Sequence, residues 1–193
     1  MLIFYDFEVF KFDWLVVFII PETRSKIAIV NDSEKLKSFY DTHKDFIFLG
    51  YNSRSYDSYI FKSILLDMTP YLVSTQMINE GKKGWELNKN FYKMQLYNFD
   101  VMTSQHSLKE LEGFMGNNIK ESSVSFDIDR ELTEFELQEV IEYCTHDVEQ
   151  TIKVFLKRKK DFDSHLELLK TFKLPMAYIS KTQTQLAAII LKA

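Results

Sequence analysis

The chain has 193 residues, of which 46% are apolar, and its formal net charge is −4. Phe and Tyr are frequent while Gly and Pro are scarce, which excludes a disordered, repetitive or collagen-like chain and predicts one compact domain with a substantial core. Because there is no overall basic charge, nucleic-acid binding would have to depend on local lysines or on metal ions.

Cysteine usage and hydropathy indicate a cytoplasmic protein. The single cysteine, Cys144, cannot form an internal disulfide, and the first residues lack the basic region and long apolar run of a signal peptide. The apolar run from Leu15 to Ile20 is much shorter than the roughly 20 residues that cross a bilayer. We therefore expect a reducing compartment and no membrane segment.

The first half of the chain alternates between strand and helix patterns. Three strands, expected to begin an antiparallel sheet, are predicted at residues 2–10, 14–20 and 25–31. A helix at 33–43 and a buried strand at 45–52, closed by Gly50, follow. The next predicted elements are helices at 55–67 and from Pro70 to Gly81, and then one or two strands between Trp85 and Met102.

The second half reads as helical. Ser107 with Glu110 and Thr133 with Glu136 have the spacing of capping boxes, the second opening a long helix. The apolar stripe of that helix consists of Val140, Ile141, Cys144, Val148, Ile152 and Phe155. The basic run at 157–160 is expected to form its solvated last turns, with a nucleic-acid-binding patch as the alternative.

The opening strand carries two acids where a buried strand should be apolar. Asp6 and Glu8 are two residues apart, so their carboxylates point to one face of the strand while Tyr5, Phe7 and Val9 point to the other. Neighbouring carboxylates in an apolar setting are costly unless a cation or protons relieve their repulsion. We therefore expect a compensating group beside this pair.

Two further groups of polar residues have the spacing of site residues. Asn52 and Asp57 bracket the junction between a predicted strand and the next helix, where side chains can face a cleft at the sheet edge. Tyr143 and Asp147 are four residues apart and therefore share one face of the long helix. Taken singly, these four also have structural interpretations: in order, a turn residue, a first-turn acid, a core aromatic and the partner of a lysine.

Together the four acids follow one known order. The pattern is acid-x-acid, then Asn-x-x-x-Tyr-acid, then Tyr-x-x-x-acid, along a β-β-β-α-β-α chain. Over most of residues 1–160 the sequence resembles the DEDD exonuclease superfamily, and the tyrosine in YCTHD makes it similar to the DEDDy branch, most of all to the proofreading exonuclease domains of phage family-B DNA polymerases. The resemblance implies an α/β, RNase H-like fold: a mixed sheet with three antiparallel strands followed by parallel ones, flanked by helices.

The resemblance also implies an activity and its cofactors. The expected reaction is hydrolysis of phosphodiester bonds in single-stranded DNA from the 3′ end, by a mechanism that uses two divalent metal ions. Oxygen ligands suit Mg²⁺ or Mn²⁺, and the sequence shows no cluster of Cys and His that would suit zinc. By resemblance, Asp6 would bridge both ions, Glu8 and Asp147 would complete the first, and Asp57 would hold the second.

The remaining roles concern water and substrate. The resemblance implies that Tyr143 hydrogen-bonds the attacking water, and that Asn52 and Tyr56 contact the 3′-terminal nucleotides, the tyrosine by stacking. Ser107 and Leu108 are similar to a Ser-Leu pair that touches the single strand in these exonucleases, although they could equally serve as a helix cap and a core residue. Lys120 stands near the place of a lysine that supports catalysis in protein-primed polymerases.

Val9 departs from the family pattern, which often has Thr at this point to contact the terminal nucleotide. The departure affects a substrate contact rather than the metal ligands.

The chain is expected to divide into an exonuclease domain at residues 1–160 and a C-terminal helical extension at residues 161–193. Because the helical pattern continues to Ala193, we expect the extension to lead into a polymerase portion. Two alternatives stay open: a stand-alone DEDDy ribonuclease, and an inert domain that binds single strands or acts as a scaffold. If the protein is phage-encoded, the cytoplasm would be that of the host cell.

Overall fold

The computed structural model describes residues 1–102, 106–116, 119 and 122–192. Its centre is a five-stranded sheet with the order β3-β2-β1-β4-β5. The strands are β1 (Leu2–Val9), β2 (Trp14–Ile20), β3 (Ser25–Val30), β4 (Ile47–Gly50) and β5 (Asn98–Asp100). β1 pairs antiparallel with β2 and β2 with β3, whereas β4 runs parallel to both β1 and β5. The predicted α/β class with an RNase H-like mixed sheet is confirmed.

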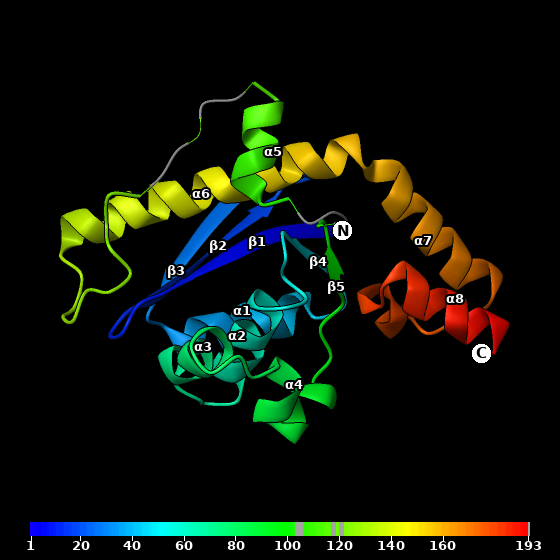
Figure 1. Ribbon diagram of the computed structural model, residues 1–193, viewed down its shortest axis with the longest axis horizontal. Helices are drawn as coiled ribbons and strands as arrows, with labels where there is room; N and C mark the ends of the chain where they lie inside the picture. Colours follow the sequence, from blue (N-terminus) through cyan, green and yellow to red (C-terminus); the bar gives the residue numbers. More distant parts are fainter. Residues whose placement is uncertain (103–105, 117–118, 120–121, 193) are drawn as a thin grey trace.

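Helices cover both faces of the sheet (Figure 1). One face carries α1 (Ser33–His43), α2 (Asp57–Leu65) and α3 (Pro70–Ile78), and the other carries α6 (Glu134–Lys157), with α5 (Leu108–Phe114) beside it. Each face has its own hydrophobic core, one built on α2 with Phe61 and one on α6 with Val140 and Val148. The sheet is thus buried on both sides, which explains the near-continuous apolar sequence of β2.

The alternation in β1 follows the predicted pattern. Tyr5, Phe7 and Val9 enter the core under α1 to α3. Asp6 and Glu8 lie opposite Val17 and Leu15 of β2 and point to the α6 side. The two acids therefore stand on a central strand, beneath the longest helix of the described chain.

The segment between Trp85 and Met102 departs from the prediction of one or two long strands. Only β5 is a strand in this segment, and it is preceded by α4 (Gly84–Leu87) and by a 3₁₀ helix (Lys89–Tyr92). An aromatic residue of this segment packs against α2: Phe91 is 1% exposed and its ring centre lies 5.6 Å from that of Tyr59. A side chain at Gly84 would lie 2.3 Å from the Tyr59 ring, so the chain crosses α2 there at close range.

The predicted end of the long helix is also corrected. α6 ends at Lys157, Arg158 leaves the helical conformation, and α7 (Lys159–Thr171) begins at once, so residues 157–160 are not one helix end. The bend brings Phe162 edge-on against both Phe99 of β5 and Phe155 of α6. The bend therefore allows aromatic contacts that join α6, α7 and β5.

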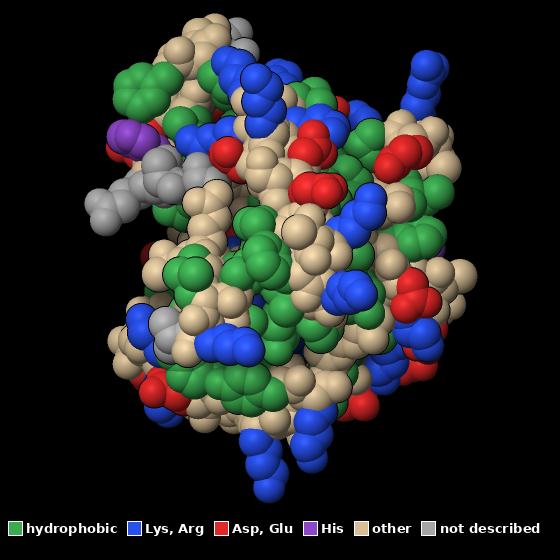
Figure 2. Space-filling view, turned by 90° about the vertical axis from the view of Figure 1, so that its right-hand side faces the viewer, with side chains coloured by type: hydrophobic (Ala, Val, Ile, Leu, Met, Phe, Trp, Pro, Cys, Tyr) green, Lys and Arg blue, Asp and Glu red, His purple; other side chains and the backbone are tan. Residues whose placement is uncertain are grey.

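The C-terminal residues pack onto the same core as α6. α7 is followed by a 3₁₀ helix (Met176–Ser180) and by α8 (Gln183–Leu191). Phe162, Leu169, Ile179 and Leu186 are buried in one cluster with side chains of α6. Figure 2 looks onto this side of the molecule, where apolar side chains gather among lysines and acids. An open, mainly apolar groove of about 390 Å³ lies between α7 and α8.

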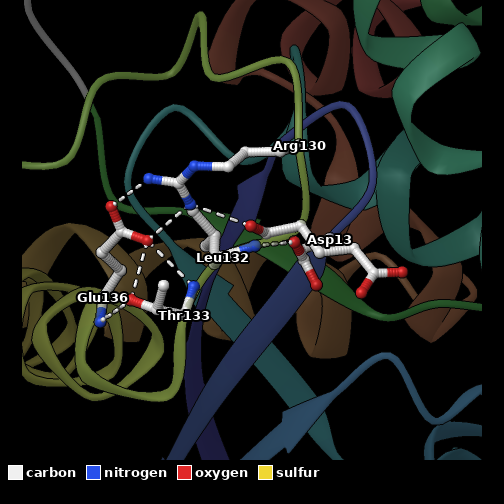
Figure 3. A network of polar contacts seen from close by, with 6 residues as sticks. Asp13, Arg130, Leu132, Thr133 and Glu136 are labelled. Atoms are coloured by element: carbon white, nitrogen blue, oxygen red, sulfur yellow. Dashed lines mark hydrogen bonds and ion pairs between the residues drawn. The ribbon is translucent and has the colours of Figure 1, made fainter.

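Residues 122–132, which we call the strap, connect to the N-terminus of α6 and lie against the β1–β2 turn. Both oxygens of the buried Asp13 carboxylate accept hydrogen bonds, one from the backbone N–H of Leu132 (2.8 Å) and one from the Asn31 amide (2.7 Å). Arg130 forms a two-fold contact with Glu136, whose carboxylate also accepts the N–H of Thr133 (Figure 3). The predicted capping box at Thr133 is confirmed and is part of this network.

Across the described residues, none of the helices combines the length and the apolar character needed to cross a membrane.

Candidate functional site

The site is built on the acidic face of β1, under α6. One oxygen of Asp6, one of Glu8 and the Cys144 sulfur all lie within 4.8 Å of one another. Cys144 is on the apolar stripe of α6, and its sulfur lies 3.4 Å from the Asp6 carbonyl oxygen and 3.8 Å from Oδ2. The contact fixes the rotation of α6, so that the residues one position before and three positions after Cys144 also face the strand.

Asp57 joins this group from the start of α2. It is 5% exposed, and its Oδ1 accepts the backbone N–H of Phe7 at 3.2 Å, which ties the residue to the strand segment between the two β1 acids. The approach requires a tight turn after β4, and Gly50 permits it, because a Cβ there would lie 2.6 Å from the Cβ of Ser53. Asp57 therefore lies beside β1 although it is far away in the sequence.

Tyr143 and Asp147 complete the predicted group from α6. Asp147 is 8% exposed, and burial raises its pKa, although the hydrogen bonds from Lys109 and from the Tyr143 hydroxyl counteract this rise. Burial, followed by the charges of Asp147 and Glu8, raises the pKa of Tyr143, so the phenol keeps its proton and remains a donor. The helical spacing of four residues thus places one donor and one acceptor together above the strand acids.

The electrostatics show that the four carboxylates act on one another. Burial, then the charges of Asp147 and Asp57, raises the pKa of Glu8 to about 8. Burial raises the pKa of Asp57 to about 7, although the N–H of Phe7 counteracts it. The pKa of Asp6 is raised well above its usual value by burial and then by Asp57, Glu8 and Asp147. Four acids on one small surface repel, as predicted for the β1 pair, and a positive charge there relieves the repulsion.

Lys109 of α5 is a residue of this site that the sequence analysis missed. Its ammonium forms an ion pair with Asp147 and lies 4.6 Å from the centre of the Tyr143 ring, within the range of a cation–π contact. Its charge also counteracts part of the rise that burial and the neighbouring acids cause in the pKa values of Asp6 and Glu8. The interpretation of Asp147 as the partner of a lysine is therefore correct, but that lysine belongs to the acidic site.

A second buried group adjoins the first through Asp147. One ligand atom each of Glu112, His146 and Asp147 lie within 4.8 Å of one another. The side chain of Glu112 is fully buried, and its Oε1 accepts a hydrogen bond from His146 Nε2 at 2.6 Å. Its Oε2 has no hydrogen bond, and Lys109 Nζ lies 3.5 Å away. The spacing of three residues between Lys109 and Glu112 on α5 is the only sequence signal for this group.

These clusters could hold a metal ion. The first group offers carboxylate oxygens, the ligands that Mg²⁺ and Mn²⁺ favour. The structure does bring Cys144 to the acids, which the sequence did not indicate, but burial and the neighbouring acids raise the pKa of this thiol well above its usual value. A thiol that keeps its proton is a poor metal ligand, so the oxygen atoms define the chemistry of the site.

Two predicted substrate residues lie in the loop that leads to Asp57. Asn52 is exposed, and its backbone adopts the left-handed conformation with a φ of 57°. Its backbone N–H donates a hydrogen bond to the carboxylate of Asp100. Tyr56 is partly buried, and its hydroxyl shares a 2.7 Å hydrogen bond with Ser74 of α3. The structure thus keeps Asn52 accessible and anchors Tyr56 toward α3.

The residue that shapes this loop is Asp100, at the end of β5. Its carboxylate also accepts the backbone N–H groups of Arg54 and Met102, at 3.1 and 2.9 Å. No motif spacing links Asp100 to the loop, so this support could not be predicted from the sequence.

The other predicted residues do not join the acidic cluster in the described part of the chain. Ser107 caps α5 by accepting the backbone N–H of Glu110, and Leu108 packs partly buried against the α6 core. The structural interpretation of both residues is thereby confirmed. Lys120 lies outside the described residues.

Comparisons of the chain with protein-family models, with curated proteins and with solved structures found no match.

Proposed function

We propose that this protein is a 3′-to-5′ exonuclease that hydrolyses phosphodiester bonds of single-stranded DNA. The observation that carries the proposal is the convergence of Asp6, Glu8, Asp57 and Asp147, from β1, α2 and α6, on one buried surface with Tyr143 at its rim. The convergence has a high electrostatic cost, which a structural role alone would not require. By the resemblance described above, we further propose that the domain proofreads as part of a longer DNA polymerase.

The acids would hold two divalent ions, Mg²⁺ or Mn²⁺. Asp6 is central, because the charges of the other three carboxylates all act on it, and it would contact both ions. Glu8 and Asp147 would share one ion, since burial and then the charge of Asp147 raise the pKa of Glu8, and Asp57 would hold the other. When bound, such ions make water nucleophilic near neutral pH and stabilise charge on the phosphate and the leaving oxygen.

The protein's own groups would orient the reaction. The Tyr143 hydroxyl, which is protonated and held by Asp147, would hydrogen-bond the attacking water. The exposed Asn52 lies on the loop before Asp57 and would contact the terminal nucleotide. By the resemblance, Tyr56 would contact the terminal nucleotides by stacking, which tolerates any base, so we expect cleavage to be independent of sequence.

The test is a time course on 5′-labelled single-stranded DNA and on matched RNA, with Mg²⁺, Mn²⁺ or EDTA. We expect a ladder that shortens from the 3′ end of the DNA, requires metal, and is lost in Asp6→Asn. Asp163→Asn is the matched control, because this exposed acid pairs only within α7, with Lys159, and its substitution should leave the rate unchanged.

Three other results of this time course would contradict parts of the proposal. Equal activity of Asp6→Asn and the wild type would refute the metal-site assignment. Faster shortening of the RNA would indicate a ribonuclease. No shortening of either strand, with folded protein and saturating Mn²⁺, would favour an inert binding or scaffold domain.

A further inference from the structure

Lys109 and Glu112 form an ion pair beside the proposed metal ligands. The proposed roles of the metal ligands and of Tyr143 do not require this pair. Both residues lie on α5, one turn apart, and both face α6. Lys109 is three-quarters buried, and its ammonium has two carboxylates within ion-pair distance, Asp147 and Glu112. A lysine is unexpected at this position, because its positive charge opposes the binding of divalent ions by the same acids.

The contact with Asp147 is the closer one. Lys109 Nζ donates to Asp147 Oδ1, an oxygen of a proposed metal ligand, and the same ammonium lies over the ring of Tyr143. A divalent ion and an ammonium that contact the same carboxylate repel each other and compete for its lone pairs. Ion binding at Asp147 therefore requires the ammonium to weaken or release this contact.

Glu112 offers the ammonium a second position. Its side chain is fully buried and its Oε2 has no hydrogen bond, which is costly for a carboxylate oxygen. Nζ of Lys109 lies 3.5 Å from this oxygen, slightly beyond hydrogen-bonding distance, while His146 holds the other oxygen in place. A short movement of Nζ from Asp147 toward Glu112 would satisfy Oε2 and free Asp147.

We propose that Lys109 is a positioning residue that competes with the divalent ion for Asp147, and that Glu112, fixed by His146, accepts the ammonium when the ion binds. This inference rests on the proposed function for the identity of Asp147 as a metal ligand. The arrangement limits metal affinity and couples the position of α5 to occupancy of the site. It also links ion binding to Tyr143, because the ammonium that leaves Asp147 moves relative to the ring.

The test measures Mn²⁺ affinity by titration calorimetry, with no DNA present. Lys109→Gln removes the competitor, so we expect the Kd for Mn²⁺ to fall by about three- to tenfold, as for other close charge pairs. Lys109→Arg keeps the charge and should stay near the wild-type value. The matched control is Lys26→Gln, which removes a lysine that pairs with Glu149 of α6 outside the site, and its affinity should not change.

A double-mutant cycle tests the role of Glu112. Glu112→Gln weakens the second position, so Lys109 should hold Asp147 more firmly and the Kd for Mn²⁺ should rise by about threefold or more. In the double variant Lys109→Gln with Glu112→Gln this increase should disappear. A simple loss of negative charge predicts the same increase in both backgrounds and would overturn the role of Glu112. The melting temperature of each variant shows whether it is folded, and if Glu112→Gln is not, the comparison of Lys109→Gln with Lys109→Arg decides.

The outcomes separate this inference from the proposed function. If the wild type binds Mn²⁺ in a manner that Asp6→Asn abolishes, but Lys109→Gln leaves the Kd unchanged or raises it, competition by Lys109 is refuted while the metal centre stands. If no saturable binding depends on Asp6, the metal centre itself is refuted, and the inference with it. Loss of DNA hydrolysis alone would leave the Mn²⁺ result intact.

Discussion

At the scale of single residues, burial and neighbouring charges set the protonation state of the site residues. Glu8 and Asp57 hold their protons to about pH 8 and pH 7 because they are buried next to other acids. One lysine, Lys109, offsets part of this repulsion. Neutral Tyr143 supplies a donor that is insensitive to pH in the physiological range, since its pKa is raised.

Substitution of Tyr143 by Phe separates water positioning from metal binding. Phe keeps the ring over which Lys109 lies but lacks the hydroxyl that bonds to Asp147. We expect turnover to fall by about ten- to a hundredfold, because the attacking water loses its orienting partner. The Kd for Mn²⁺, measured by calorimetry, should change little.

Unchanged turnover of Tyr143→Phe would remove the tyrosine from the mechanism. Phe135→Leu is a suitable control, because Phe135 is 79% exposed on the same helix and outside the site.

Substitution of Asp57 by Asn tests how far the repulsion among the four acids lowers the stability of the folded protein. The Asn oxygen can still accept the N–H of Phe7, but the side chain carries no charge. In EDTA at pH 8 we therefore expect Asp57→Asn to be more stable than the wild type, with a higher melting temperature, and to be unable to bind the full complement of Mn²⁺. A lower melting temperature at pH 8 would show that the charge of Asp57 is stabilised by a contact other than that with the N–H of Phe7.

At the scale of elements, the periodicity and capping signals were the most reliable predictors. The alternation in β1, the capping boxes of α5 and α6, and the helical spacing of Tyr143 and Asp147 were all predicted, since each depends only on local geometry. The prediction of one or two strands between Trp85 and Met102 was wrong, because Phe91 lies in a 3₁₀ helix and packs on Tyr59 of α2. Lys109 was missed because its partners in the acidic site, Asp147 and Tyr143, lie on another helix, and no periodicity reports a contact between helices.

The strap depends on one buried acid. Asn at position 13 retains one acceptor oxygen and so cannot serve both Leu132 and Asn31. We expect Asp13→Asn to lower the free energy of unfolding by about 1 to 3 kcal/mol, the usual cost of a buried polar group without its partner, as measured by urea titration.

The control for the strap is Asp129→Asn, which removes only an exposed ion pair with Lys11 and should cost about 1 kcal/mol or less. Equal effects of the two substitutions would show that the Asp13 contacts do not anchor the strap.

At the scale of the whole molecule, the cluster couples stability to pH and to metal. Glu8 and Asp57 have raised pKa values in the folded state, so between their unfolded values near 4 and their folded values of about 8 and 7 the folded state binds more protons than the unfolded state. Their contribution to stability is therefore greatest at the acidic end of this range and is lost as the pH rises through 7 and 8. Bound cations oppose this loss because they bind only the folded site.

The expected result is a melting temperature in EDTA that falls between pH 5.5 and pH 8, less steeply for Asp57→Asn than for the wild type. Saturating Mn²⁺ should raise the wild-type melting temperature, and more so at pH 8 than at pH 6, because the ligands must lose their protons to bind the ion. Differential scanning calorimetry across this range measures both effects. Parallel pH profiles of the wild type and Asp57→Asn would contradict the coupling.

The length of α6 also limits how this protein can change. Thr133 fixes the start of the helix and Cys144 fixes its rotation over β1, so the distance along the chain between them is set by the helical repeat. One residue inserted between these two points would turn Tyr143 and Asp147 by about 100° away from the strand acids. Insertions in the strap, before Thr133, would not rotate Tyr143 and Asp147 relative to the strand acids. Length variation among natural or engineered versions of this chain should therefore accumulate in the strap and be absent from the first three turns of α6.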